Sequence, residues 1–140
     1  MSNIHIFSDN VLAKAVLQLA ITAATTAGTV IDTMGYTRAA LVCTMTPTGA
    51  ATTANCSLTE GSAANGSDQA SVTGGAFAQS ATGALVGIQV LNIDLTFRKR
   101  YLSASFTGAG GAAAGIADVK LFLYNGEGLP PAQDNATITV

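Results

Sequence analysis

The sequence predicts an all-β protein, an antiparallel β-sandwich or jelly-roll-like single domain of seven or eight short strands. Short runs of alternating apolar and polar residues recur at roughly regular spacing along the chain, and clusters of Gly, Asn, Ser and Pro separate them. No helical pattern of about 10–15 residues lies between these runs. An alternating βαβ fold is therefore excluded, because its parallel strands need helical crossovers.

The composition limits the size of the fold and the classes of function. The chain has 140 residues, enough for one domain, and it is 49% hydrophobic, which is too apolar for a disordered chain. Its formal net charge of −2 gives no electrostatic footprint for nucleic acid or anionic lipid. The apolar stretch Val11–Ile21 contains Lys14 and Gln18 and is too short to span a membrane.

We expect an N-terminal arm at residues 1–10, a β-sandwich domain at 11–131 and a C-terminal tail at 132–140. The first segment of the domain, Val11–Thr22, fits either a helix or a strand. A helix would gather Val11, Ala15 and Gln18 on one face. The β-branched content after Val16 favours a strand that runs through Leu17, Leu19 and Ile21.

Turns and strands then alternate as far as the middle of the chain. The clearest strand is Tyr36–Thr46, in which Leu41, Cys43 and Met45 face one way and Tyr36, Arg38, Val42 and Thr44 the other. The other elements expected here are, in order, a turn at Ala23–Gly28, a strand at Val30–Asp32, a turn at Met34-Gly35, a loop at Pro47–Ala54 and a strand at Asn55–Glu60.

The second half begins with Gly61–Gly75, which has almost no large apolar residue and is predicted to be a long surface loop. The most strand-like stretch of the chain follows, Ala84–Phe97, and Arg98-Lys99-Arg100 marks its end. The remaining elements are a strand at Tyr101–Thr107, a loop at Gly108–Gly115, a strand at Val119–Tyr124, a turn at Asn125–Pro131 and, within the tail, strand-like alternation at Thr137–Val140. The expected core is Leu41, Cys43, Leu58, Val90, Leu95, Leu102, Phe106, Leu121 and Leu123.

The sequence does not predict a reaction centre, a metal site or a cofactor site, so we expect no enzyme. His5, Asp9 and a Ser could form a triad on paper, but no G-x-S-x-G elbow accompanies them and an N-terminal arm is a poor scaffold for catalysis. A zinc site needs more ligands than one His and two Cys provide. The Gly-rich stretches are not followed by Lys-Ser or Lys-Thr, as a phosphate-binding loop would be.

Two further features allow two interpretations each. Cys43 and Cys56 lie on the inner side of consecutive strands, where a hairpin would pair them; we interpret them as buried core thiols rather than a disulfide, because the N-terminus has no signal-peptide pattern. Arg98, Lys99 and Arg100 form either a patch for an acidic partner or a solvated turn, neutralised by Asp94 and Asp118. Three cations are too few for a nucleic-acid site.

The surface composition favours association. A sandwich leaves strand edges open, and monomers usually guard such edges with Lys, Pro or bulges. This chain has three Pro and, outside the cluster at 98–100, three further Lys or Arg, so its faces must consist largely of Ala, Thr, Ser and Gly. Such faces lose little side-chain entropy when they become immobile. We therefore expect copies of the chain, or a larger assembly, to cover its edges.

Three segments resemble a known protein family. They are Val30-Ile31-Asp32-Thr33-Met34-Gly35-Tyr36-Thr37-Arg38, then Leu58-Thr59-Glu60-Gly61-Ser62, and then Arg98-Lys99-Arg100-Tyr101-Leu102-Ser103-Ala104-Ser105-Phe106-Thr107. Their order is similar to that in small structural proteins of tailed bacteriophages, of the capsid decoration or cement type. The resemblance covers residues 30–124. Ser103 departs from the pattern, K-R-Y-(V/L)-R, which has Arg at that position.

The resemblance implies a virion protein without catalytic residues. It would bind the outer surface of a phage head, trimerise, contact the major capsid protein and hold neighbouring capsid subunits together, after synthesis in the host cytoplasm. With that function we expect partner contacts from the two chain ends and the cation cluster, namely Ile4, Ile6, Phe7, Arg98, Lys99, Arg100, Ile138 and Val140. The alternatives are a tail-associated or head-fibre base protein, and a host- or carbohydrate-binding module if Tyr36, Tyr101 and Tyr124 gather on one exposed face.

Overall fold

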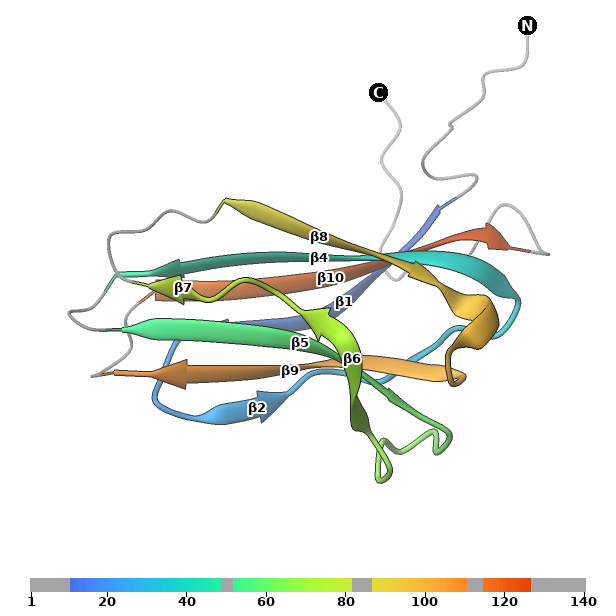
Figure 1. Ribbon diagram of the computed structural model, residues 1–140, viewed down its shortest axis with the longest axis horizontal. Coiled ribbons are helices and arrows are strands. Elements are labelled where there is room, and N and C mark those ends of the chain that lie inside the picture. Colours follow the sequence, from blue (N-terminus) through green and yellow to red (C-terminus); the bar gives the residue numbers. More distant parts are fainter. Residues whose placement is uncertain (1–10, 49–51, 82–86, 111–114, 127–140) are drawn as a thin grey trace, which may run out of the picture.

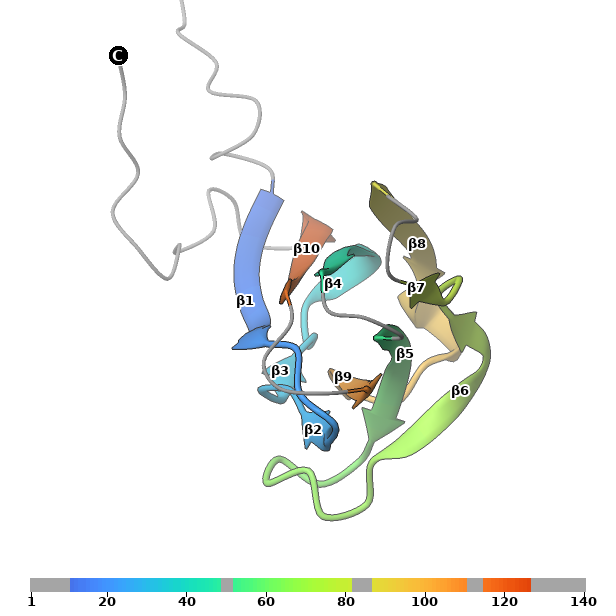
Figure 2. The ribbon, with the colours of Figure 1, turned by 90° about the vertical axis from the view of Figure 1, so that its left-hand side faces the viewer.

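The computed structural model describes residues 11–48, 52–81, 87–110 and 115–126, and these form two antiparallel sheets packed face to face (Figures 1 and 2). Sheet A has the strand order β1-β10-β4-β8. Sheet B has the order β2-β9-β5-β6, with β3 also beside β9 and β7 also beside β5. The strands of sheet A are β1 (Val11–Ala20), β4 (Tyr36–Pro47), β8 (Ile88–Asp94) and β10 (Gly115–Gly126). Those of sheet B are β2 (Thr25–Ala27), β3 (Ile31–Asp32), β5 (Thr53–Gly61), β6 (Ala70–Ala76), β7 (Ser80–Ala81) and β9 (Tyr101–Ala109).

The connectivity is that of a jelly roll. The strands β2 and β3 lie beside the same strand, β9, and β6 and β7 lie beside the same strand, β5, so each pair acts as one interrupted strand. Counted in this way, eight strands remain, and the first, β1, pairs with the last, β10. The predicted fold class is confirmed: the protein is an all-β antiparallel sandwich folded as one domain.

The core lies between the two sheets and matches the predicted set with one exception. Leu41, Cys43 and Met45 are buried on the inner face of β4, as their alternation indicated. Val90 was expected in the core but is 55% exposed, so this prediction was wrong. The reason is that β8 carries apolar side chains on both faces: Ile88 and Val90 point outward, while Leu91 and Ile93 point inward. Period-two alternation cannot choose between two apolar faces.

The ambiguous N-terminal segment is a strand, as the β-branched content favoured. The pairing of β1 with β10 shifts by one residue between Ala15 and Leu17, so Val16 is the extra residue of a β-bulge. The bulge changes which face each following side chain occupies. Leu12 and Val16 are therefore buried together with Leu17 and Ile21, although they differ in parity.

Several predicted element boundaries differ from the structure; the last strand, for example, was predicted at Val119–Tyr124 and spans Gly115–Gly126. The predicted turn Ala23–Gly28 contains β2, whose side chains are all exposed and which backbone pairing with β9 holds in place. The predicted loop Gly61–Gly75 contains most of β6. The strand predicted to end at Phe97 ends at Asp94, because the Asp94 carboxylate accepts a hydrogen bond from the Thr96 N–H and begins a 3-10 turn, η1 (Leu95–Phe97). The predictions for the arm at 1–10, for Leu85 and for Thr137–Val140 lie outside the described residues.

Candidate contact surfaces

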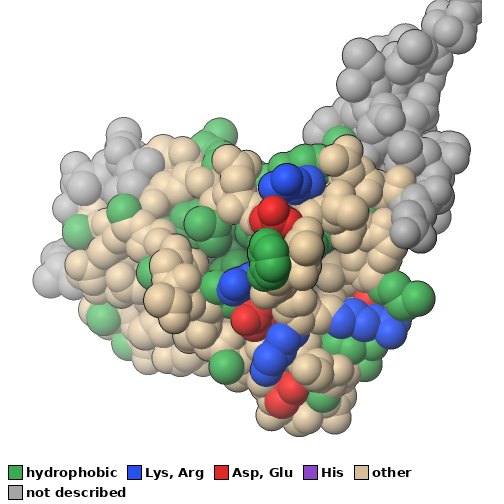
Figure 3. All heavy atoms as spheres, turned by 45° about the vertical axis from the view of Figure 1, so that its right-hand side comes forward, with side chains coloured by type: hydrophobic (Ala, Val, Ile, Leu, Met, Phe, Trp, Pro, Cys, Tyr) green, Lys and Arg blue, Asp and Glu red, His purple; other side chains and the backbone are tan. Residues whose placement is uncertain are grey.

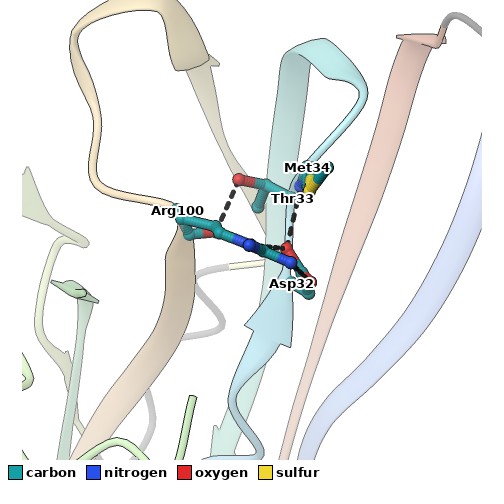
Figure 4. Close-up of polar contacts among 4 residues, drawn as sticks. All are labelled: Asp32, Thr33, Met34 and Arg100. Atoms are coloured by element: carbon teal, nitrogen blue, oxygen red, sulfur yellow. Dashed lines mark hydrogen bonds and ion pairs between the residues drawn. The ribbon is translucent and has the colours of Figure 1, made fainter. Parts of the chain in front are cut away.

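The cation cluster lies where three parts of the chain meet. The Arg98 guanidinium lies 3.5 Å from the Glu60 carboxylate, and the same carboxylate accepts a hydrogen bond of 3.1 Å from the Lys99 N–H. Arg100 donates two hydrogen bonds to Asp32, from Nε to Oδ1 at 2.8 Å and from Nη2 to Oδ2 at 2.6 Å (Figure 4). Glu60 on β5 and Asp32 on β3 therefore hold the two arginines.

The expectation that Asp94 and Asp118 neutralise this cluster was wrong. Asp94 lies opposite Arg38 in the β4–β8 register and forms an ion pair of 3.1 Å with it. Asp118 pairs with Lys120, two residues further along β10. Register decides the first pair, because Arg38 and Asp94 are cross-strand neighbours, whereas Asp118 and Lys120 lie on the same face of β10 two residues apart.

The Asp32–Arg100 corner is built from backbone as well as side chains. Thr33 donates two hydrogen bonds to the Arg100 carbonyl, from Oγ1 at 2.7 Å and from its N–H at 3.0 Å, and the Met34 N–H donates to Asp32 Oδ1 at 3.0 Å (Figure 4). The Arg100 guanidinium also lies over the Tyr101 ring, 5.1 Å from its centroid. The hydrogen bonds from Arg100, aided by that of Met34, lower the pKa of Asp32 below its usual value.

The three segments that carry the family resemblance thus contact one another. The first supplies Asp32 and Thr33, the second supplies Glu60 and the third supplies the arginines. Strand pairing joins them as well, since Asp32 and Gly61 are both register partners of Tyr101. The residue types of these three segments are explained by the one structural corner that they form where β9 begins.

The other predicted contact residues, Ile4, Ile6, Phe7, Ile138 and Val140, lie outside the described residues, so their role stays a prediction. The role of Arg98, Lys99 and Arg100 as partner contacts also stays a prediction. The structure shows that Arg98 and Arg100 are already paired with acidic side chains of the chain itself.

The outer face of sheet A carries exposed apolar side chains that the sequence analysis did not single out. Ile88 is 72% exposed and Val90 is 55% exposed on β8, and Ile116 is 58% exposed on β10. Val42, on the strand between them, is the register partner of Val90. We call Val42, Ile88, Val90 and Ile116 the sheet A patch. The signal that could have revealed it is the apolar content of β8 at odd and even positions alike.

A second apolar surface is a cleft of about 260 Å³ between β8 and β6. Leu58 and Ile93, both buried, and the half-buried Leu91 and Val72 line it. Phe97 also lines it and is 79% exposed, which places this ring at the rim. Figure 3 shows hydrophobic side chains in a hollow beside a column of alternating cationic and acidic side chains.

A bulge in β6 forms one wall of the cleft. The pairing of β5 with β6 passes from Ser57 opposite Ala76 to Thr59 opposite Ser71, so residues 72–75 of β6 stand opposite the single residue Leu58. Gly74 has a φ of +77°, a left-handed conformation that favours glycine, and allows the chain to bend within the bulge. Residues 72–75 line one side of the cleft, and Leu91–Asp94 of β8 line the other.

The two cysteines face each other across the core rather than within a hairpin. Cys43 lies on β4 in sheet A and Cys56 on β5 in sheet B, and both are free and buried. The hydrogen bond between their thiols and the burial of Cys43 raise the pKa of the Cys43 thiol. A thiol held in its neutral form is a poor nucleophile. The interpretation as core thiols therefore agrees with the structure, whereas the expected hairpin pairing was wrong.

The part of the chain that the structure describes bears on three other kinds of site. No group of three or more His, Cys, Asp or Glu there could hold a metal ion. The same residues include no helix that is long and apolar enough to cross a membrane. Tyr36 and Tyr124 lie on sheet A and Tyr101 on sheet B, and all three are half-buried. They do not form the exposed aromatic face that a carbohydrate-binding module would need.

Comparison with known proteins finds likeness in structure. No family model matches the chain, and no curated protein matches it in sequence. A chain from the solved structure described as "Bacillus endospore appendages form a novel family of disulfide-linked pili" is 12% identical, with a TM-score of 0.44, and the match covers 89% of this chain and 96% of that chain. A likeness at this level assigns no partner or activity to this chain.

Proposed function

We propose that this chain is a virion structural protein that binds the outer surface of a phage head and stabilises the contacts between major capsid subunits. The family resemblance supplies the partner. The surface supports a role in contact: exposed apolar side chains gather on sheet A, while most of the described charged side chains form ion pairs within the chain.

The sheet A patch is the observation that carries this proposal. Ile88 and Val90 on β8 and Ile116 on β10 are each more than half exposed, on the two strands that flank β4 in sheet A. A monomer recovers no hydrophobic free energy from such side chains, whereas a partner that covers them gains about 25 cal/mol per Å² of apolar area removed from water. We place the capsid contact on this face.

The physical effect on the head would be one of linkage. A protein that binds assembled subunits, and not separated ones, shifts the equilibrium toward the intact shell. Trimerisation, which belongs to the same proposal, would let one particle hold several capsid subunits at once. Each weak contact is then strengthened by the effective concentration that the others create.

The test is to add the purified protein to heads stripped of it and to measure the temperature at which DNA is released. We expect the wild-type chain to raise this temperature and Val90→Lys to raise it much less, because the lysine places a charge in the patch. Ser71→Lys, on an exposed position of sheet B, is the matched control and should act like wild type. If the wild-type chain gives no increase, the proposal is wrong. Labelling of tails alone in electron micrographs would select the tail-associated alternative.

A further inference from the structure

We propose that Cys43 and Cys56 are a site of covalent modification, at which a small-molecule disulfide oxidises the two thiols to a disulfide that joins sheet A to sheet B through the core. This proposal does not depend on the identity of the larger assembly. It rests on the matching positions of the two cysteines on facing strands, on a buried serine that links the same region of the two sheets, and on the contact between the thiols.

The two cysteines lie at matching positions on facing strands. Strand β4 ends at Pro47 in sheet A, β5 begins at Thr53 in sheet B, and the two strands face each other across the core (Figure 2). Cys43 lies four residues before Pro47, and Cys56 lies three residues after Thr53. At about 3.3 Å per residue, the two cysteines therefore differ by about 3 Å in their distance from these strand ends.

A buried serine links the two sheets beside the cysteines. Ser80 on β7 pairs with Ala54 of β5, and its Oγ donates a hydrogen bond of 3.3 Å to the Met45 carbonyl of β4. Met45 lies two residues beyond Cys43, and Ala54 lies two residues before Cys56. Because a serine side chain is short, this bond requires the two sheets to approach closely here. A disulfide needs the same close approach, since its two Cα atoms lie about 5.5–6 Å apart.

The two thiols are in contact and are not equivalent. Cys43 donates a hydrogen bond to the sulfur of Cys56 and lowers the pKa of Cys56, while burial acts in the opposite direction. The Ser57 N–H adds a further hydrogen bond that lowers it. The Cys43 thiol is held in its neutral form. Cys56 is therefore the better nucleophile of the pair, because the thiolate is the reactive form.

The oxidation takes two thiol–disulfide exchanges. The Cys56 thiolate first attacks one sulfur of the small-molecule disulfide, forms a mixed disulfide and releases one small thiolate. The Cys56 thiolate, which raised the pKa of Cys43, no longer exists in this intermediate. Cys43 then loses its proton and attacks the Cys56 sulfur, which releases the second small thiolate. In total the two cysteines lose two electrons and two protons, and the oxidant gains both and becomes two thiols.

Burial decides when this reaction can occur. Cys43 is 0% exposed and Cys56 is 2% exposed, so an oxidant reaches a sulfur only when the sandwich opens. The thiols persist in a reducing compartment, and an oxidising compartment favours the disulfide. The redox state of the surroundings therefore sets whether the two sheets are covalently joined.

The disulfide should make the fold more resistant to unfolding. It closes a loop from residue 43 to residue 56, which limits the freedom of the unfolded chain. By linkage, the factor by which folding favours the disulfide equals the factor by which the disulfide favours folding. For a loop of this length we expect a factor of at least about ten.

The test measures this factor with the full chain and glutathione as the probe. Fully reduced and fully oxidised samples are each equilibrated with one fixed mixture of reduced and oxidised glutathione, in buffer and in concentrated urea. Mass spectrometry after acid quenching separates the disulfide form, which is lighter by two hydrogens. We expect the ratio of oxidised to reduced chain to be at least about ten times larger in buffer than in urea.

Urea unfolding of the oxidised and reduced wild type gives a second measurement. The midpoint should rise by about 1 M on oxidation and return on reduction. Cys43→Ala and Cys56→Ala are the matched controls, and the same treatment should not raise their midpoints. The main comparison uses one sequence in two redox states, so it does not depend on how well these variants fold.

A ratio in buffer no larger than that in urea would overturn the proposal, because the folded geometry would then not favour the bond. Disulfide-linked dimers on a non-reducing gel would also overturn it, since the cysteines would then pair between copies. The same holds if the folded chain keeps glutathione as a stable mixed disulfide, or if oxidation lowers the urea midpoint.

Discussion

Along the β1–β2 side of the sandwich the backbone joins the two sheets, whereas side chains join them along the β8–β6 side. On the first side, the Thr29 N–H, just after β2, donates to the Val16 carbonyl of β1 at 2.7 Å. The N–H groups of Gly28 and Gly108 donate to the carbonyls of Ala104 and Ala24 and tie the β2 segment to β9 within sheet B. On the second side, the Gln89 amide bridges to Ala78, and the 260 Å³ cleft lies beyond it.

The difference shows how one sandwich can be sealed at one edge and receptive at the other. Backbone closure demands close approach: a Cβ on Gly108 would lie 2.2 Å from the Thr22 carbonyl oxygen, and one on Gly28 would lie 2.7 Å from Val16 Cγ1. Closure by side chains keeps the sheet edges further apart. On the first side, the close approach leaves no space for a larger side chain at Gly28 or Gly108. On the second side, the cleft leaves room for a partner.

The largest difference in stability is expected between substitutions of two phenylalanines, one in the closed core and one at the rim of the open cleft. Phe106 is 1% exposed on β9, and Phe97 is 79% exposed at the cleft rim. We expect Phe106→Ala to reduce the free energy of unfolding by about 4 kcal/mol, because it leaves a core cavity. Phe97→Ala should reduce it by about 0.5 kcal/mol. Urea unfolding followed by circular dichroism measures both, and equal losses would contradict the distinction between a sealed and an open side.

Glycine substitutions test backbone closure. Gly108→Ala should cost about 3 kcal/mol, because the new Cβ meets a backbone carbonyl that cannot move without displacing the β1–β2 connection. Gly74→Ala meets no atom within 4 Å and should cost about 1 kcal/mol, from its left-handed φ alone. The same unfolding experiment compares them. If Gly108→Ala reduces the free energy of unfolding by no more than Gly74→Ala does, the β1–β2 connection can move aside without a large loss of stability.

The Gln89 bridge tests closure by side chains. Gln89→Ala removes both hydrogen bonds to Ala78 and should lower the free energy of unfolding by about 1 kcal/mol. It should also speed hydrogen exchange at the Ala78 N–H, which nuclear magnetic resonance can follow. Gln18→Ala, at an exposed position of β1, is the control and should change stability by less than about 0.5 kcal/mol. Unchanged exchange at Ala78 in the Gln89 variant would argue against the bridge.

The smallest effect concerns pH. Arg100 holds the pKa of Asp32 below its usual value of 3.8, so the folded state favours the charged carboxylate more than the unfolded state does. This stabilisation is fully present above the unfolded pKa and is lost as the pH falls through the lower, folded pKa. Asp32→Asn, which keeps an acceptor for the Met34 N–H, should therefore be less stable than wild type at neutral pH.

The two proteins should converge in strongly acidic solution, since Asp32 is then protonated in the wild type as well. Thermal unfolding at a series of pH values measures the difference. The pair is partly exposed, so solvent screening makes its contribution smaller than those of the variants above. A difference that grows on acidification would have the wrong sign and would refute the linkage.

Much of the fold could be predicted from local pattern. Larger apolar side chains recur at every second position in Tyr36–Thr46 and Asn55–Glu60, and the side chains predicted to face inward are buried. The fold class followed because these strands recur without intervening helices. The strand β2 could not be predicted, since its exposed Thr and Ala side chains carry no burial signal and its pairing with β9 holds it in place.

The candidate surfaces were harder to predict than the fold. The cation cluster was visible in the sequence, but its partners Glu60 and Asp32 lie on other strands and are brought close only by pairing with β9. The sheet A patch was hidden, because Val90 and Leu91 are equally apolar and one residue of register decides which is exposed. The cleft is lined by the bulge of β6 opposite Leu58, which no local residue pattern indicates.

The sequence by itself determined that the chain is an all-β sandwich and which side chains of its regularly alternating strands form the core, because alternation along one strand is a local property. Tertiary structure decided which face of β8 is exposed, which acid holds each arginine, and which side of the sandwich stays open. These depend on register and on the meeting of distant strands, and the free energy that selects them comes from contacts between segments that the sequence separates.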